Sequence, residues 1–396
     1  MSQRYYLRSI PRAERFQWDH FVCQHPHGHL LQSWEWGELK ASAGWHPLRL
    51  ALWDAQQNEM LAAAQVLRKG FGRVPLWAGH LAYTPKGPVV DWSQPLPSNE
   101  ITTSSVGADS SCPPPIDRPA GTPHVHPDKF SQSHNTRQQA SLAQTFLSLI
   151  NAKLRREGAL ALQMELGQAL GTAEGDGIVD CLRTLHFHPA QAIQPVRTIT
   201  LDLRPDEDTL LARMKEKWRY NVRLAGRKGV QVRPGQTVED VRAWYALLQS
   251  TGERDQFGIH TLDYYQQAWH LLVPHNIARL FLAEYQGQLL AGIIVGLFAK
   301  QAIYLYGASS NEQRHLMPNY LLQWEAMRWA KQEGATSYDL WGISETDDAS
   351  DALAGVSRFK SGWGGEIVRF IGNYEHVYRP MKMYLARRLL SSLKGA

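Results

Sequence analysis

The sequence predicts an α/β fold made of two similar layered domains. The chain has 396 residues and 43% of them are hydrophobic, which is more than one ordinary core requires and enough to fill two. A weak internal repeat divides it into comparable halves, and a long polar stretch interrupts the first half. These three observations set the expected architecture.

Two β-hairpins form the first part of the repeat. The segment from Leu50 to Leu67 aligns with the segment from Leu280 to Leu297, and each has an acidic residue followed shortly by glutamine in its middle. Apolar runs flank a polar turn in both, which is typical of strand, turn and strand. We therefore expect an equivalent hairpin in each half.

A helix followed by a strand forms the second part of the repeat. Residues Phe146–Gly158 and Leu322–Gly334 carry apolar side chains at helical spacing, and both end in Glu-Gly-Ala before an apolar or alternating run. A glycine at this place stops a helix. Helix, hairpin, helix and strand, repeated twice, describe tandem domains of the GNAT (acyl-CoA N-acyltransferase-like) kind.

The polar stretch is an insertion into the first half. Leu67 and Glu157 are 90 residues apart, whereas the equivalent Leu297 and Glu333 are 36 apart, so the first half carries 54 more. Residues 93–139 supply the excess and are rich in Pro, Ser, Thr and Gly. Such a segment cannot offset its ordering entropy by burial, and we predict that it is disordered.

The composition indicates a cytoplasmic protein. No stretch approaches the roughly 20 apolar residues of a membrane span, and the opening MSQRYYLRSIPRAERF lacks the apolar centre of a signal peptide. The three cysteines are far apart and never form Cys-x-x-Cys, so neither disulfides nor a thiolate metal site is expected. The net charge of +5 allows, without demanding, a polyanionic partner such as RNA.

Seven motifs follow one another along the chain. They are Gln32-Ser-Trp-Glu-Trp-Gly-Glu-Leu-Lys40, Tyr83-Thr-Pro-Lys-Gly-Pro-Val-Val-Asp91, Lys217-Trp-Arg-Tyr-Asn-Val-Arg-Leu-Ala-Gly-Arg-Lys-Gly-Val230, Tyr304-Leu-Tyr-Gly-Ala-Ser309, Pro318-Asn-Tyr-Leu-Leu-Gln-Trp-Glu-Ala326, Tyr338-Asp-Leu-Trp-Gly342 and Arg358-Phe-Lys-Ser-Gly362. In this order they resemble the FemA/FemB/FemX (FemABX) family of aminoacyl-tRNA-dependent peptidoglycan bridge-forming aminoacyltransferases.

The resemblance implies a reaction and a division of the chain. An amino acid would pass from aminoacyl-tRNA to an amine of the stem peptide of a peptidoglycan precursor, either lipid-linked or UDP-MurNAc-pentapeptide, without a cofactor. A GNAT-like domain at 1–195 would bind the precursor, a second at 196–369 would face the aminoacyl-tRNA across an inter-domain cleft, and 370–396 would return to the first domain. Residues 210–228 are too short for the helical arm that some members carry, so the compact type is expected.

The same resemblance assigns the catalytic candidates. Lys360, preceded by Phe359, matches the position beside the aminoacyl ester and the tRNA end, where an ammonium group can stabilise an oxyanion. The alternative is a core phenylalanine followed by a solvated surface lysine. Asp91 could orient or deprotonate the attacking amine, although a turn or N-cap role explains it equally well.

Six more residues match precursor-binding positions. Lysines at two of them suit the charged groups of a pyrophosphate, and tyrosines offer apolar area with one hydrogen bond. They are Lys40, Tyr83, Lys86, His260, Tyr264 and Tyr306. His260 stands where relatives have an arginine, which weakens the expected phosphate contact because a neutral imidazole binds anions less well. A helix-end role for Lys40 and a turn role for Lys86 are the alternatives.

Two further segments have open interpretations. The basic run 215–233 matches either a helix that lies along RNA phosphates or an ordinary solvated face. The tail 381–393 combines apolar Met381, Tyr384, Leu385 and Leu389 with basic residues, and it could contact the inner face of the membrane or pack on the first domain.

Other functions are less consistent with the sequence. An acyl-CoA-dependent transferase needs a glycine-rich turn at a helix N-terminus, and the equivalent segment 314–320 has no glycine, so no CoA is expected. A metal is not expected either, because His25, His27 and His29 have no acidic or cysteine partner at ligand spacing. A GNAT-fold transferase with a different amine acceptor, and a relative that only binds, remain alternatives.

Overall fold

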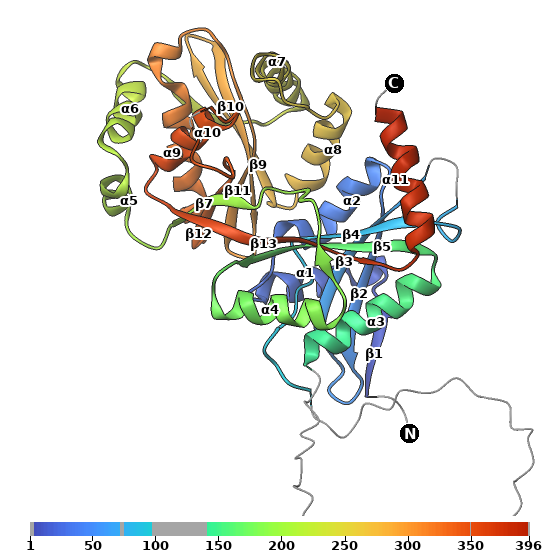
Figure 1. Ribbon diagram of the computed structural model, residues 1–396. Helices are drawn as coiled ribbons and strands as arrows, with labels where there is room; N and C mark the ends of the chain where they lie inside the picture. Colours follow the sequence, from blue (N-terminus) through green and yellow to red (C-terminus); the bar gives the residue numbers. More distant parts are fainter. Residues whose placement is uncertain (1–3, 72–74, 97–140, 349, 395–396) are drawn as a thin grey trace, which may run out of the picture.

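The computed structural model describes residues 4–71, 75–96, 141–348 and 350–394, the last six of these without their side chains. In these residues one mixed 13-stranded sheet runs through the molecule, and helices cover both of its faces (Figure 1). Its strand order is β1-β2-β3-β4-β5-β13-β7-β12-β11-β10-β9-β8, with β6 paired to β13.

The elements of the first half are these, in chain order: β1 Tyr5–Ser9, α1 Arg15–Gln24, α2 Trp34–Ser42, β2 His46–Asp54, β3 Glu59–Gly70, β4 His80–Pro85, α3 Leu142–Arg156, β5 Ala159–Ala169, α4 Ala173–Thr184 and β6 His188–Pro189. Those of the second half are β7 Arg197–Asp202, α5 Glu207–Arg213, α6 Glu216–Arg227, β8 Gln231–Pro234, α7 Val238–Asp255, α8 Leu262–Leu272, β9 Ala278–Tyr285, β10 Gln288–Phe298, β11 Gln301–Ser309, α9 Pro318–Gln332, β12 Ser337–Gly342, α10 Ala354–Ser361, β13 Glu366–Val377 and α11 Pro380–Lys394.

The predicted repeat is present in the structure. Antiparallel β2 and β3 correspond to antiparallel β9 and β10, which confirms both hairpins. Helices α3 and α9 then each lead through a glycine with positive φ, Gly158 at 90° and Gly334 at 87°, into β5 and β12. Glycine adopts this backbone conformation without a Cβ clash, so it ends each helix where the sequence predicted. In both halves the following strand pairs parallel with the last strand before the helix.

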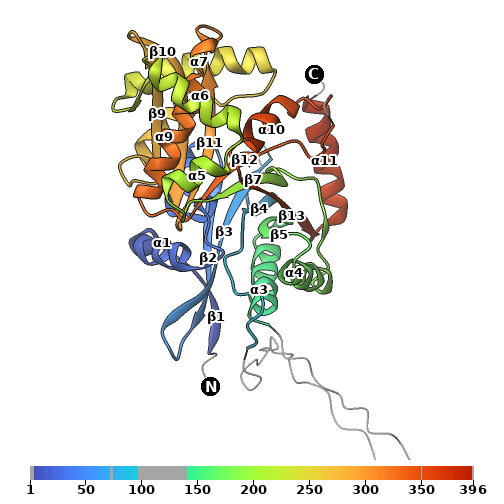
Figure 2. The same ribbon diagram turned by 90° about the vertical axis from the view of Figure 1, so that its left-hand side faces the viewer.

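Alternating side chains on each strand fill cores on both faces of the sheet. In β2, Leu50 and Leu52 pack under α3 and α4, whereas Ala51 and Trp53 pack under α1 and α2. Figure 2 shows α1 and α3 on opposite sides of these strands. The second half repeats the arrangement, with α6 and α9 on one face and α7 and α8 on the other.

Two features join the halves. Strand β13 pairs with β7 through Glu366–Arg369 and with β5 through Phe370–Val377, so it makes the sheet continuous. In addition, Leu30, Leu31, Trp36 and Leu39 of the first half share one hydrophobic cluster with α7 and α8. The site residues lie along this seam.

The ends of the predicted insertion are packed together. Residues 97–140 lie outside the described residues, but Leu96 is buried and Pro95 forms a β-bridge with Ser141. Leu142 N donates to Gln94 O, and Ser141 caps α3. The polar segment therefore begins after Leu96 and not at Ser93 as the composition suggested, because Leu96 has a place in the core of the first half.

Removing 97–140 and joining Leu96 to Ser141 through a short glycine linker should leave the melting temperature and the activity close to those of the full chain, since the two ends already lie together. Thermal unfolding of both proteins tests this expectation. The matched deletion of 93–140, which also removes Leu96, should melt at a lower temperature. A large loss of stability in the shorter deletion would contradict the prediction.

The structure gives different answers for the two segments that the sequence left open, the basic run 215–233 and the tail 381–393. The basic run forms α6, with Trp218 and Val222 buried against α9 and Tyr220 exposed, so one face of the helix is structural. Helix α11 packs on β5, but through Met383 and Ala386. Of the four apolar residues for which the sequence left membrane contact and packing open, Met381, Tyr384 and Leu385 are exposed, and the side chain of Leu389 lies outside the described ones. Among the described residues, no helix is both long and apolar enough to cross a membrane.

Candidate functional site

Lys360 is buried in the seam between the halves. Its side chain leaves α10, is 6% exposed, and donates from Nζ to the carbonyl oxygen of Gly342 at 2.8 Å. The ammonium group lies 5.4 Å from the centre of the Tyr304 ring. Burial lowers the pKa of Lys360 to about 8, and nearby Asp339 opposes that shift. The solvated surface alternative for this lysine is therefore wrong.

Asp339 supplies the negative charge that faces Lys360. Its carboxylate, on β12, accepts hydrogen bonds from the Thr198 hydroxyl and, at 2.7 Å, from the backbone N–H of Trp341. Burial raises the pKa of Asp339 above its usual value, while those hydrogen bonds and the charges of Lys86 and Lys360 oppose the increase. Sequence reasoning missed this residue. The available signal was a single acid in the otherwise apolar strand Tyr338–Gly342.

Lys86 approaches Asp339 from the first half. It has a φ of 48° in the turn after β4, yet its side chain is 3% exposed, so a turn role does not account for the whole residue. Within the described residues its Nζ has no hydrogen-bond partner and lies 3.4 Å from the centre of the Phe370 ring. Burial lowers its pKa to about 8, against the charges of Asp339 and Glu165.

We call Lys86, Asp339 and Lys360 the Asp339 cluster. It unites side chains that are 274 residues apart at their extremes, and it joins two ammonium groups to one carboxylate. When all three groups are ionised the cluster is positively charged. A buried positive site of this kind stabilises negative charge strongly, because little water screens it.

A second group, which we call the Tyr264 cluster, joins four predicted residues: Lys40, His260, Tyr264 and Tyr306. Lys40 Nζ, on α2, donates to the Tyr264 hydroxyl on α8 at 2.8 Å, and that hydroxyl is 3.4 Å from the hydroxyl of Tyr306. The rings of His260 and Tyr264 stack with centroids 4.0 Å apart. Burial, and then the charge of Lys69, lower the pKa of Lys40 to about 8. The cluster is open to solvent at His260.

A β-bulge in β11 separates Tyr304 from Tyr306. Regular alternation would place both rings on one face, but Val295 pairs with Tyr304 and Ile294 pairs with Tyr306, leaving Leu305 as the extra residue. Tyr304 consequently packs in the core beneath α9, and Tyr306 packs on the opposite face beside α8. The bulge therefore places Tyr304 beside Lys360 and Tyr306 in the Tyr264 cluster.

Tyr83, on β4, is buried. Its hydroxyl donates to Glu165 Oε2 at 2.5 Å, and the other oxygen of Glu165 accepts from the backbone N–H groups of Ile193 and Gln194. The Tyr83 ring also faces Trp45, with centroids 6.2 Å apart. Contact with a precursor is untested for Tyr83, and its present contacts are structural.

Asp91 and Phe359 have structural contacts of their own. The exposed carboxylate of Asp91 accepts from the backbone N–H and hydroxyl of Ser93 and from Gln94 N, and the Ser93 hydrogen bond is the main cause of its lowered pKa. The turn alternative therefore accounts for Asp91 as the structure has it. Phe359 packs edge-on against Tyr320 and Trp363. The proposed roles of Asp91 at the attacking amine of the precursor and of Phe359 at the aminoacyl end stay predictions.

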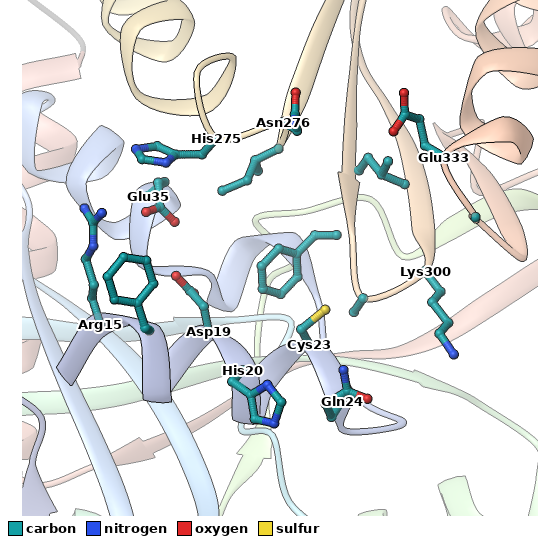
Figure 3. A pocket seen from close by; sticks show the side chains of 16 residues that line it. Arg15, Asp19, His20, Cys23, Gln24, Glu35, His275, Asn276, Lys300 and Glu333 are labelled. Carbon is teal, nitrogen blue, oxygen red and sulfur yellow. The ribbon is translucent and has the colours of Figure 1, made fainter.

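The pocket in Figure 3 lies elsewhere on the seam. It has a volume of about 550 Å³ between α1 on one side and the α8–β9 and β10–β11 connections on the other, and none of the predicted site residues lines it. It contains a carboxyl pair, Asp19 and Glu35. Burial, followed by the charge of Glu35, raises the pKa of Asp19 to about 7. We regard the clusters as the site, because they contain most of the predicted site residues and the pocket contains none of them.

The raised pKa of Asp19 predicts a pH effect on stability. The pKa of Asp19 is about 7 in the folded protein, compared with an ordinary value of 3.8. Protonated Asp19 therefore stabilises the folded protein fully below about pH 4, and this stabilisation is lost as the pH rises through 7. Asp19→Asn should therefore reduce the fall in melting temperature between about pH 5 and pH 8. Thermal unfolding across this range measures it, with the exposed Asp180→Asn as control. Parallel curves for wild type and Asp19→Asn would contradict the assignment.

Comparison with known proteins connects this geometry to a family. A model described as the FemAB family matches residues 13–98, 183–286 and 275–391. Among similar proteins, the lipid II:glycine glycyltransferase of Staphylococcus saprophyticus is 24% identical over 428 residues, covering 91% of this chain and 90% of that protein. The enzyme of the same name from Staphylococcus aureus strain COL is 25% identical over 426 residues, with the same coverage.

Solved structures show the same fold. The crystal structure of FemX superposes with a TM-score of 0.75 at 22% identity, covering 96% of this chain and all of that one. A tandem GNAT protein from the clavulanic acid biosynthesis pathway gives 0.53 at 10% identity, covering 94% and 98%. The tandem GNAT-like α/β fold predicted from the sequence is confirmed.

Proposed function

The chain belongs to the FemAB family, and from that premise we propose that it transfers an amino acid from aminoacyl-tRNA to an amine on the stem peptide of a peptidoglycan precursor. The family model spans both halves of the chain and includes both clusters. The relatives named above are lipid II:glycine glycyltransferases, which makes glycine the first donor to test and a lipid-linked precursor the first acceptor.

The observation that carries the proposal is the buried ammonium group of Lys360. In aminolysis the amine nitrogen bonds to the ester carbonyl carbon, a tetrahedral oxyanion forms, and the bond to the tRNA ribose oxygen then breaks. A fixed cation stabilises that oxyanion in a site from which water is largely excluded. Lys360 meets this requirement, since among the described residues its Nζ donates to Gly342 O and retains two further donor positions.

The Tyr264 cluster suits the acceptor. Lys40 provides a point charge for a phosphate or carboxylate of the precursor, and Tyr264 and Tyr306 provide ring surface and hydroxyl groups. Exposed Lys69 adds a second positive charge near Lys40. This pair of lysines offers an anion contact that does not require an arginine at position 260. We propose that 1–195 holds most of the precursor and that 196–369 holds the aminoacyl ester.

The decisive experiment supplies the protein with a pool of labelled aminoacyl-tRNAs and either lipid-linked or nucleotide-linked precursor. We expect label in the stem peptide with at least one acceptor, and glycyl-tRNA as a productive donor. Acetyl-CoA with the same acceptors serves as the control for acyl-CoA chemistry. Transfer of label only to a different amine, or transfer only from acetyl-CoA, would refute the proposal.

A further inference from the structure

Helix α11 presents a row of exposed apolar side chains at the edge of the molecule. Met381, Tyr384 and Leu385 are 76%, 57% and 56% exposed, whereas Met383 and Ala386 are buried among the residues of α11 whose side chains are described. Figure 1 shows α11 beside β5 at the C-terminal end of the chain. Leaving large apolar groups in water is unfavourable, and a row of them on one helix face marks an interaction surface. The packing of α11 on β5 therefore uses one side of the helix, and no described part of the chain covers Met381, Tyr384 and Leu385.

A second exposed aromatic residue extends this surface. Trp77, in the connection between β3 and β4, is 77% exposed, and its carbonyl oxygen lies against Gly158 at the start of β5. The N-terminus of α11 is anchored at the same point, because Tyr378 N and Arg379 N donate to Leu160 O at 2.9 and 3.2 Å. Trp77 and α11 thus flank one end of β5.

The charges around these side chains are mostly positive. Exposed Arg155 and Arg156 end α3 just before Gly158, and exposed Lys382 lies within the apolar row of α11. The acidic groups beside them are already paired: Glu157 binds Lys153 and Arg68, and Glu375 binds Arg387. Apolar and aromatic groups surrounded by basic ones match the interface of a bilayer that contains anionic lipids.

The surface is continuous with the proposed acceptor site through the end of β3. Phe71 packs into the cluster of Leu160, Met383 and Ala386, and Lys69, two residues earlier, lies over the Trp45 ring at 5.2 Å and acts on Lys40. A precursor whose headgroup reaches Lys40 and Lys69 would hold its hydrocarbon chain on the side of α11.

We propose that Trp77, Met381, Tyr384 and Leu385 form a membrane-docking face that places the acceptor site at an anionic bilayer surface. The inference extends the proposed function in one respect, since it takes the acceptor to be lipid-linked. Docking itself needs no acceptor and no donor, so it is measured independently of transfer.

The test is sedimentation of the full chain with vesicles of phosphatidylglycerol and phosphatidylethanolamine, and with phosphatidylcholine vesicles for comparison. We expect binding to the anionic vesicles that weakens with salt, and a loss of about tenfold or more in the triple variant Met381→Ser/Tyr384→Ser/Leu385→Ser. Phe16→Ser, a control on α1 with 74% exposure, should bind like the wild type. Equal melting temperatures establish that the variants are folded.

Three results would overturn the docking face. The first is no vesicle binding by the wild type, and the second is undiminished binding by the triple variant. The third is a wild-type dimer that the triple variant abolishes, since the face would then be an interface between copies.

Transfer to the nucleotide-linked precursor separates the two proposals. Retained transfer in the triple variant together with lost vesicle binding supports both. Vesicle binding without transfer by the wild type leaves the docking face standing and refutes the proposed function.

Discussion

Lys360→Met should lower the transfer rate at saturating substrates by at least about tenfold, with little change in the melting temperature. Methionine fills nearly the same volume but carries no charge, so it removes the ammonium group from the site while keeping the packing of α10 against β12. The loss should appear mainly in kcat, because an oxyanion exists in the transition state and not in the bound substrates. Single-turnover transfer from aminoacyl-tRNA measures it.

Lys331→Met is the matched control for that experiment. Lys331 on α9 is half-buried and, like Lys360, donates to backbone carbonyl oxygens, those of Leu203 at 2.7 Å and Arg204 at 3.1 Å, but it belongs to neither cluster. Its substitution should leave the transfer rate unchanged. If Lys360→Met and Lys331→Met had equal rates, both close to the wild type, Lys360 would have only a structural role.

Asp339→Asn should destabilise the protein by roughly 1–3 kcal/mol, because it removes the negative charge that interacts with two buried ammonium groups. The substitution removes the carboxylate that faces Lys86 and Lys360 and leaves two ammonium groups in a seam where they are 3% and 6% exposed. It should also lower the pKa of Lys360 below its value of about 8, because the opposing charge is gone. Denaturant unfolding at neutral pH measures the stability.

A second substitution distinguishes charge from packing. In Asp339→Asn/Lys86→Met one uncompensated cation is removed, so the double variant should recover much of the stability that Asp339→Asn loses. Lys86→Met alone should cost little, since the Lys86 ammonium group has no hydrogen-bond partner among the described residues. Additive effects of the two substitutions would show that Asp339 and Lys86 do not interact through charge.

The two clusters also explain why the halves remain together. Lys40 donates across the seam to Tyr264, the charges of Lys86 and Asp339 attract each other across it, and β13 makes the sheet continuous. Each of these two interactions joins a residue of 1–195 to a residue of 196–369. We therefore propose that the donor and acceptor parts of the reaction are aligned by the same contacts that hold the domains in register.

Local sequence determined the repeated elements. The hairpins at Leu50–Leu67 and Leu280–Leu297 and the glycine stops at Gly158 and Gly334 were predicted because period-two alternation and a glycine with positive φ are properties of a few consecutive residues. The resemblance to the FemABX family, carried by ordered motifs, is confirmed by the family match. The resemblance assigned Lys40, Tyr264 and Tyr306 to precursor binding, which stays a prediction, and the structure brings the three side chains together.

Tertiary structure alone decided which neighbours these residues have. Asp339 was missed because its partners Lys86 and Lys360 come from distant segments, and only the closed seam desolvates all three. The bulge at Leu305 sent Tyr304 and Tyr306 to opposite faces, which alternation within the strand does not reveal. Helix α11 shows the same limit: its amphipathic pattern was visible in the sequence, but the packing of Met383 and Ala386 on β5 determined which apolar face stayed in water. Burial and charge pairing depend on contacts between distant segments, and these arise only when the chain folds.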